Sequence, residues 1–213
     1  MSHRSLRRLA LRAFAAAVLL VAAPALAQTP VAPAPPAATV KVTLTTSEGP
    51  IVLELQREKA PITTANFLRY VDQKRYDGVT FYRASKTPNA PEFGLIQGGA
   101  QNDPARVLKP IAHEPTTKTG LSHTDGAISM GRFNPGSATS DFFIVVGDMT
   151  YMDANPALPG DNLGFAVFGK VVEGMDTVRK ILAAPTSPTK GEGVMKGEIL
   201  AKPVKIITAR RAG

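Results

Sequence analysis

The residues able to take part in chemistry fall into three segments of the chain: 81–99, 126–144 and 165–176. The first carries Arg83 and Gln97, which lie on neighbouring predicted strands, and the second carries Phe143 among apolar neighbours. Gly98 and Gly99 let the backbone pass close to a neighbour or a ligand. Such a group fits a site that binds through hydrogen bonds and apolar contacts. It fits equally a surface arginine and a core phenylalanine.

Other kinds of catalytic site find little support. The sequence has no cysteine, which excludes disulfides, thiolate nucleophiles, iron–sulfur clusters and cysteine-ligated zinc. It contains no G-x-S-x-G, H-E-x-x-H or P-loop motif. The glycine-rich run 191–197 has one residue too many for a dinucleotide-binding loop, and no predicted strand leads into it.

Two histidines follow residue 27, His113 and His123. A triad of Ser140, His123 and Asp141 can be assembled, but chance easily supplies such a combination. The pair His113-Glu114 lacks further ligands at a metal-binding spacing. We interpret it as a surface pair and predict no metal site.

The formal net charge of +8 is concentrated at the N-terminus. The first 27 residues hold four arginines and no acidic residue, which leaves 21 basic against 17 acidic residues in the rest of the chain. That balance is typical of an ordinary soluble surface, and no basic stretch is interleaved with aromatic residues. We therefore predict that nucleic acid is not a partner.

The first 27 residues have the pattern of a secretory signal peptide. Basic residues at 1–12 precede an apolar run at 13–23, and residues 25–27 (Ala-Leu-Ala) offer a signal-peptidase site. The apolar run is shorter than the roughly 20 residues that a membrane span requires. We predict cleavage after Ala27, export to the periplasm and no remaining membrane anchor. An uncleaved anchor is the alternative, and twin-arginine export stays open beside the general secretory route.

Residues 28–39 are rich in proline and alanine. Proline lacks an N–H and fixes φ, so this stretch can form neither a helix nor a strand ladder. We predict an extended tether, with a partner-binding proline motif as the alternative. One domain over residues 40–213 follows.

The pattern of the domain is mainly β. Alternating residues predict a hairpin of Val40–Thr46 and Pro50–Gln56. Pro61 opens a helix expected to end near residues 74–76, and a second helix fits Asp176–Ala183. Further strands are expected at Val79–Arg83, Leu95–Gly98, Gly126–Met130, Phe142–Val146, Val167–Val171 and Lys205–Ala209. Many strands, two helices and no βαβ rhythm favour a closed barrel or a sandwich.

The run Pro61-Ile62-Thr63-Thr64-Ala65-Asn66-Phe67 and the three segments above occur in an informative order and spacing. With them the chain resembles the cyclophilin-type peptidyl-prolyl cis–trans isomerases, in an exported bacterial form, over nearly all of residues 40–210. The resemblance implies a mainly β fold, an eight-stranded antiparallel closed barrel capped by two α-helices.

The resemblance also implies catalysis of rotation about X–Pro bonds. The barrier is roughly 18–20 kcal/mol because amide resonance must be broken. A site lowers this barrier when it binds the twisted amide better than either planar isomer. No covalent bond is made, so we expect neither a cofactor nor a metal. Arg83 matches the catalytic arginine that donates a hydrogen bond to the prolyl nitrogen, and Gln97 matches the glutamine that holds the peptide and helps orient that arginine.

Further positions match the family's substrate-binding residues. Phe143 matches the floor of the proline pocket, and Leu95 and Met152 match its apolar walls. A plain core or rim role is the alternative for these two. Gly131 and Arg132 match the edge whose backbone pairs with substrate. Three more residues complete the predicted substrate-binding set: Phe93, Tyr151 and Phe165.

Some positions depart from the family pattern. Gly94 stands where the family has an aromatic residue, at the end of a longer segment, and Phe93 is the candidate substitute. Tyr151 occupies the site of a tryptophan that favours cyclosporin, which predicts weak sensitivity to that drug. In the family, histidine is common at the position of Tyr82, glutamine at that of Asp141 and histidine at that of Phe165.

The sequence thus predicts a prolyl isomerase that assists the folding of exported proteins. Its predicted partners are proline-containing, unfolded or flexible polypeptides, and we expect a monomer. A non-catalytic peptide-binding module or chaperone using the same groove is the alternative. Gly94 and Asp141 favour that alternative, whereas the intact Arg83, Gln97 and Phe143 oppose it.

Overall fold

The computed structural model of the protein describes residues 38–212. The predicted signal peptide, and the predicted tether up to residue 37, lie outside these described residues. Over the range 38–212, none of the helices has both the length and the apolar character needed to cross a membrane.

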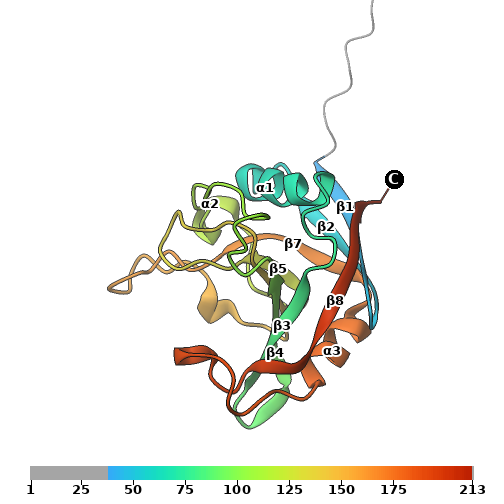
Figure 1. Ribbon diagram of the computed structural model, residues 1–213. Coiled ribbons are helices and arrows are strands. Elements are labelled where there is room, and N and C mark those ends of the chain that lie inside the picture. Colours follow the sequence, from blue (N-terminus) through green and yellow to red (C-terminus); the bar gives the residue numbers. More distant parts are fainter. Residues whose placement is uncertain (1–37, 213) are drawn as a thin grey trace, which may run out of the picture. The chain divides into compact units, whose positions relative to one another are not determined.

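Eight antiparallel strands close into a barrel in the order β1-β2-β7-β5-β6-β4-β3-β8 (Figure 1). This confirms the predicted eight-stranded antiparallel closed barrel. The strands are β1 Thr39–Thr46, β2 Gly49–Gln56, β3 Thr80–Thr87, β4 Ala90–Gly99, β5 Ala127–Met130, β6 Phe142–Val146, β7 Ala166–Glu173 and β8 Ile199–Arg211.

The longest strand, β8, closes the barrel. Its first half pairs with β3 and its second half with β1. Only Lys205–Ala209 was expected from the sequence, because Pro203 and the charged residues before it hide the apolar alternation. A strand with a partner on each side is held by its backbone pairing, whatever its local pattern.

The two predicted long helices, α1 (Pro61–Asp72) and α3 (Met175–Ala183), lie at opposite ends of the barrel (Figure 1). A third, α2 (Thr116–Thr119), has only four residues, too few to show a helical period. Two 3-10 turns complete the set: η1 (Thr150–Met152) and η2 (Gly193–Met195).

Helix α1 ends earlier than the expected residues 74–76. Lys74 adopts a φ of 55°, Arg75 N–H donates to Tyr70 O at 2.8 Å, and Lys74 N–H donates to Val71 O at 3.0 Å. These two bonds are a Schellman cap, here with lysine in the left-handed position usually held by glycine. The sequence pattern carries no glycine at this point to mark the end of the helix.

The start of α1 is capped by a distant carboxylate. Ala60 at the N-cap offers no side-chain acceptor. Glu114 Oε2 instead accepts from Thr63 N–H at 2.8 Å and Thr63 Oγ at 2.7 Å, and its Oε1 accepts from Ile62 N–H at 3.2 Å. Glu114 is fully buried. The interpretation of His113-Glu114 as a surface pair is therefore wrong for Glu114. Its carboxylate lies at the start of α1, where N–H groups without an acceptor in the helix favour an anion.

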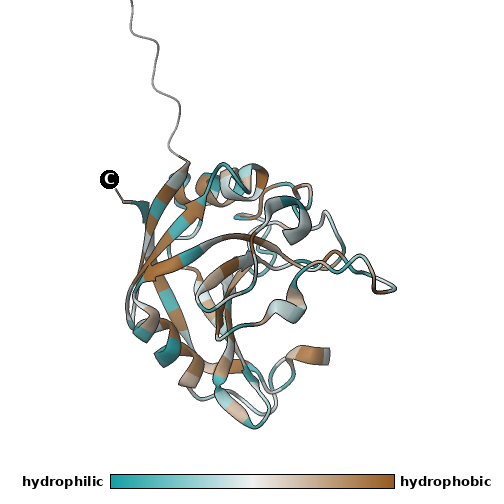
Figure 2. Ribbon diagram, turned by 180° about the vertical axis from the view of Figure 1, so that it is seen from behind, coloured by the Kyte–Doolittle hydropathy of each residue, from teal (hydrophilic) through white to brown (hydrophobic). Residues whose placement is uncertain are grey.

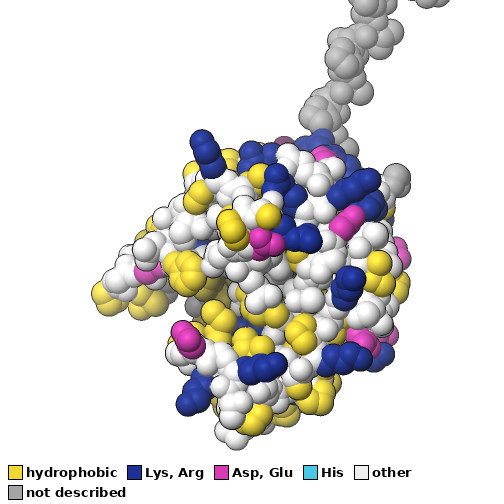
Figure 3. Space-filling model, in the orientation of Figure 1, with side chains coloured by type: hydrophobic (Ala, Val, Ile, Leu, Met, Phe, Trp, Pro, Cys, Tyr) yellow, Lys and Arg dark blue, Asp and Glu magenta, His cyan; other side chains and the backbone are white. Residues whose placement is uncertain are grey.

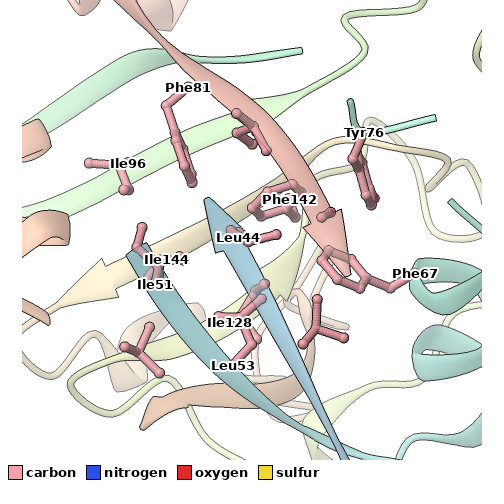
Figure 4. Packing of buried hydrophobic residues seen from close by; sticks show 14 of the residues in the cluster. Leu44, Ile51, Leu53, Phe67, Tyr76, Phe81, Ile96, Ile128, Phe142 and Ile144 are labelled. Atoms are coloured by element: carbon pink, nitrogen blue, oxygen red, sulfur yellow. The ribbon is translucent and has the colours of Figure 1, made fainter. Parts of the chain in front are cut away.

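The barrel interior is filled by aromatic and branched side chains, which Figure 4 shows from close by. Phe142 lies in edge-to-face contact with Phe67, Tyr76 and Phe81, with ring centroids 5.3, 5.5 and 5.7 Å apart. Such geometry is favoured by the ring quadrupole. Buried hydrophobic residues alternate with more exposed ones along β1 and β2, and hydrophobic and hydrophilic bands follow one another along part of the barrel (Figure 2).

A second, smaller apolar cluster lies on the outer face of the barrel. It contains Phe143 and Val145 of β6, whereas Phe142 and Ile144 belong to the interior. Successive side chains of a strand point to opposite faces, so β6 is apolar on both. The outer cluster includes Leu95, Met152 and Phe165, and it is the surface on which the candidate site is built.

Candidate active site

Four neighbouring strands bring the predicted catalytic residues into one row. Arg83 of β3 faces Gln97 of β4, and Gln97 in turn faces Phe143 of β6. Phe143 then faces Ser129 of β5. The row therefore follows from strand pairing and places an arginine beside an apolar floor.

A β-bulge at Tyr82 aims Arg83 at the site. Phe81 pairs with Gly98, but Arg83 pairs with Gln97, so Tyr82 is left without a partner in the ladder. Phe81 and Ala84 both lie in the core, while the side chains between them reach the outer face. In a regular strand, Phe81 and Arg83 would share a face. Bulges commonly re-aim side chains in this way near active sites.

The Arg83 guanidinium is held on two sides. Nη1 donates to Gln97 Oε1 at 2.8 Å, Nε donates to Glu198 Oε2 at 2.7 Å, and Nη2 lies 2.6 Å from that same oxygen. Ser85 Oγ donates to the other carboxylate oxygen at 2.7 Å. A guanidinium has five N–H donors, and three are engaged here. Among the residues that the structure describes, the other two have no partner and can meet a ligand.

A cavity of about 550 Å³ opens over this row, within the usual range for ligand sites. Hydrophobic side chains gather around the hollow on this face of the molecule (Figure 3). The lining residues are Tyr82, Arg83, Leu95, Gln97, Gln101, Asn102, Gly131, Arg132, Phe133, Ser137, Thr139, Asp141, Phe143, Met152, Phe165, Val194, Met195 and Ile199.

Eight of the ten residues predicted for the site line this cavity. Phe93 and Tyr151 do not. Tyr151 extends from η1 into solvent with 80% of its surface exposed, while its neighbour Met152 turns inward. Phe93 is 46% exposed and covers Gly147, where an added Cβ would lie 2.5 Å from its ring.

Gly94 explains why no aromatic residue fills the position next to Leu95. Its φ is +148°, and an added Cβ would lie 2.1 Å from the carbonyl oxygen of Ser85. An aromatic side chain cannot fit this backbone. The cavity therefore has one aromatic wall fewer than the family pattern implies for a proline pocket.

We expect Gly94→Ala to lower the free energy of unfolding by about 2–3 kcal/mol, since it combines strain with overpacking. Chemical denaturation measures this change. Gly160→Ala is the matched control, because Gly160 also has a positive φ, +77°, but nothing within 4 Å of an added Cβ. Equal losses in the two variants would contradict the predicted clash.

The Arg132 side chain forms hydrogen bonds with the loop that precedes β7. Its Nη1 and Nη2 donate to the two carboxylate oxygens of Asp161 at 2.6 and 2.9 Å, and Nε donates to Gly164 O at 2.9 Å. The guanidinium carbon lies 5.1 Å from the centroid of the Phe165 ring. Arg132 lowers the pKa of Asp161 through the hydrogen bond between them. Arg132 thereby braces Phe165 at the cavity wall.

Two departures from the family pattern are in contact with each other. Tyr82 Oη donates to Asp141 Oδ2 at 2.8 Å, and Asp141 Oδ1 accepts from Gln101 N–H at 3.0 Å. Burial, followed by the charge of Asp141, raises the pKa of Tyr82, so this hydroxyl stays protonated and donates. The two substitutions therefore form one unit that ties β3 to the cavity rim.

His123 lies beneath the floor of the cavity. Its ring stacks on Phe143 with centroids 5.9 Å apart, and its two nitrogens contact Asp153 Oδ1 at 2.5 Å and Ser129 Oγ at 3.1 Å. Burial lowers the pKa of His123, although Asp153 acts in the opposite direction. The imaginable triad with Ser140 and Asp141 is not formed, because His123 is fully buried with other partners.

Within residues 38–212, no group of three or more His, Asp or Glu side chains is placed to hold a metal ion.

Residues near the C-terminus complete the site and were missed by the sequence reasoning. Glu198 contacts Arg83, while Val194 and Met195 of η2 line the cavity. The glycine-rich run 191–197 had been considered only as a nucleotide loop. The available signal was the apolar pair Val194-Met195 within an otherwise polar, glycine-rich loop.

Known proteins are similar to this chain in sequence and in fold. A model of the family described as "Cyclophilin type peptidyl-prolyl cis-trans isomerase/CLD" matches residues 41–211. The chain is 39% identical over 196 residues to a peptidyl-prolyl cis-trans isomerase of Acinetobacter baylyi, covering 90% of both proteins. It is 37% identical over 175 residues to one of Streptomyces antibioticus, covering 81% of this chain and 98% of the relative.

The fold is similar to that of a cyclophilin-type isomerase of Cryptosporidium parvum crystallised in the presence of the dipeptide Ala-Pro. The TM-score is 0.64 at 20% identity, and the match covers 81% of this chain and 99% of the other. With a family match over nearly the whole described barrel and relatives at these identities, the chain belongs to the cyclophilin-type peptidyl-prolyl cis–trans isomerase family.

Proposed function

We propose that this peptidyl-prolyl cis–trans isomerase rotates X–Pro bonds of exported polypeptides in the cavity above Phe143 and so assists their folding. The observation that carries the proposal is the fixed guanidinium of Arg83. Gln97 and Glu198 hold it at the cavity wall, and within residues 38–212 two of its N–H donors have no partner.

The apolar floor suits the ring of proline. Phe165 meets Phe143 edge to face, with ring centroids 5.4 Å apart, and Leu95 and Met152 flank the pair. A proline ring buried here fixes the nitrogen side of the X–Pro amide while the carbonyl side rotates. No bond is cleaved. Apolar burial contributes about 25 cal/mol per Å² and needs no bond-making group.

Arg83 supplies what the twisted amide requires. When conjugation is lost, the prolyl nitrogen regains its lone pair, and a donor already in place stabilises it without reorganisation. Gln97 Oε1 accepts from Arg83, so the Nε2 end of the same amide group serves the substrate carbonyl. The contact of Arg83 with the prolyl nitrogen favours the rotated state over a planar isomer, which is the condition for catalysis, while the contact of Gln97 holds the peptide in place.

Exchange spectroscopy tests this function directly. Mature protein is added to an Ala-Pro-Phe peptide, and the cis-to-trans exchange rate is measured by NMR without a coupled protease. We expect a rate far above uncatalysed exchange, which takes tens to hundreds of seconds. Background exchange accompanied by peptide shift changes would overturn the proposal and support a non-catalytic peptide-binding module.

The proposed destination is the periplasm, and the support is the signal-peptide pattern of the first 27 residues. We expect protein expressed with its full N-terminus in a double-membrane bacterium to be recovered from the periplasm with Gln28 as its first residue. Intact mass spectrometry of that fraction gives the answer. A product that keeps residues 1–27 and is recovered with the membrane fraction would support the uncleaved anchor instead.

A further inference from the structure

We infer that Glu198 is a positioning residue for catalysis: it fixes the guanidinium of Arg83 in the orientation that faces the substrate amide. This inference rests on the proposed role of Arg83. It also assigns a function to the loop of residues 188–198, which we call the C-terminal loop.

The backbone places Glu198 beside Arg83. Arg83 pairs with Ile199 in the register of β3 and β8, and Ala84 N–H donates to Glu198 O at 2.9 Å. The carboxylate thus starts from a strand pair of the barrel. A group on a rigid element holds a site more accurately than one on a free loop.

The C-terminal loop is fastened at both ends. Thr186 forms a bridge with Leu200, and Ser187 N–H donates to Ile199 O at 2.8 Å. Inside the loop, Gly197 N–H donates to Lys190 O at 3.0 Å and Glu198 N–H donates to Met195 O at 3.0 Å. The loop is therefore a closed, internally bonded unit, with η2 at the cavity.

Ser85 also holds the side chain of Glu198, independently of Arg83. Ser85 Oγ occupies one carboxylate oxygen at 2.7 Å, which leaves Oε2 for both Nε and Nη2 of Arg83. Ser85 and Arg83 lie on the same strand, β3. One carboxylate thus bridges a hydroxyl and a guanidinium of a single strand, and Gln97 holds the guanidinium from β4.

Two opposing effects follow from a carboxylate at this place. It restricts a long, flexible side chain to one orientation, and it offsets part of the positive charge that the substrate meets. Both side chains reach solvent, with 16% of Arg83 and 27% of Glu198 exposed, so water already weakens the charge effect. Water does not weaken the restriction of the Arg83 side chain. The rate is proportional to the fraction of time that the donor spends in place, so losing the restriction lowers the rate. We therefore expect positioning to dominate.

The test is Glu198→Gln, with Glu192→Gln as the matched control. Both remove one carboxylate from the C-terminal loop, but Glu192 is exposed and, within residues 38–212, is not among the residues that line the cavity. Glu198→Gln should lower kcat/KM about tenfold through kcat, with peptide KM nearly unchanged, because a misplaced group costs rate rather than binding. Glu192→Gln should match wild type. Ser85→Ala should fall in between.

A spectroscopic readout separates positioning from folding. The Nε–H resonance of Arg83 in ¹H–¹⁵N spectra should be protected from solvent exchange in wild type, and should shift and lose protection in Glu198→Gln. Glu198→Asp should restore part of both the rate and the protection. Wild-type activity in Glu198→Gln, or a faster enzyme, would overturn the inference. An Arg83→Ala variant that keeps full activity would instead overturn the proposed function, whatever Glu198 does.

Discussion

Arg83→Ala is expected to slow catalysed cis–trans exchange by 30- to 1000-fold, about 2–4 kcal/mol of barrier. The variant removes the donor that we propose for the prolyl nitrogen but leaves the apolar floor of Phe143 in place. Peptide binding should therefore change far less than the rate. The exchange rate and the peptide dissociation constant are both measured by NMR on the same samples.

Arg83→Lys is the informative companion. Lysine keeps the charge but lacks the planar fork that engages Gln97 and Glu198 at once. It should recover only a minor part of the lost rate. Both variants should keep a thermal midpoint close to wild type, because Glu198 is partly exposed and can be hydrated when its partner is removed. An Arg83→Ala protein as fast as wild type would require another group to carry the reaction.

Glu114→Ala is expected to lower the free energy of unfolding by about 3–4 kcal/mol, since three donors of α1 lose their shared acceptor inside the protein. For a domain of this size the thermal midpoint should drop by roughly 6–16 °C. Calorimetry or circular dichroism measures the change. Activity below the new midpoint should be retained, because no contact to the cavity is altered.

The matched control is Glu114→Gln, which keeps the shape and one carbonyl acceptor while removing the charge. We expect it to lie between wild type and Glu114→Ala. Glu92→Ala, at an exposed position on β4, should change the midpoint little. If Glu114→Ala and Glu92→Ala unfold alike, the carboxylate cap at α1 does not contribute to stability.

The barrel could be predicted because its strands carry local signals. The strand Phe142–Val146 was predicted with the bounds that β6 has. Where a neighbour decides the structure, the local signal fails. Nothing near Tyr82 marks the bulge, because the extra residue is defined by its pairing with β4 and β8. The early end of α1 at Asp72 rests on a lysine in a conformation that sequence rules assign to glycine.

The site divides in the same way. Arg83, Gln97 and Phe143 occur in family motifs and were found from the sequence. Glu198 lies 115 positions from Arg83 along the chain, in a loop whose polar composition predicts only a connection. Phe93 was expected to compensate for Gly94, but a single sequence does not show that its ring covers Gly147 instead. Contacts of residues that belong to no sequence motif can be identified only from the three-dimensional structure.

The pairing of the first strand with the last also sets an order of events during synthesis of the chain. The strand β1, near the start of the domain, pairs with the second half of β8, which is made last. Glu198 directly precedes β8. A chain made from its N-terminus therefore cannot close its barrel or bring Glu198 to Arg83 until the final strand has been synthesised.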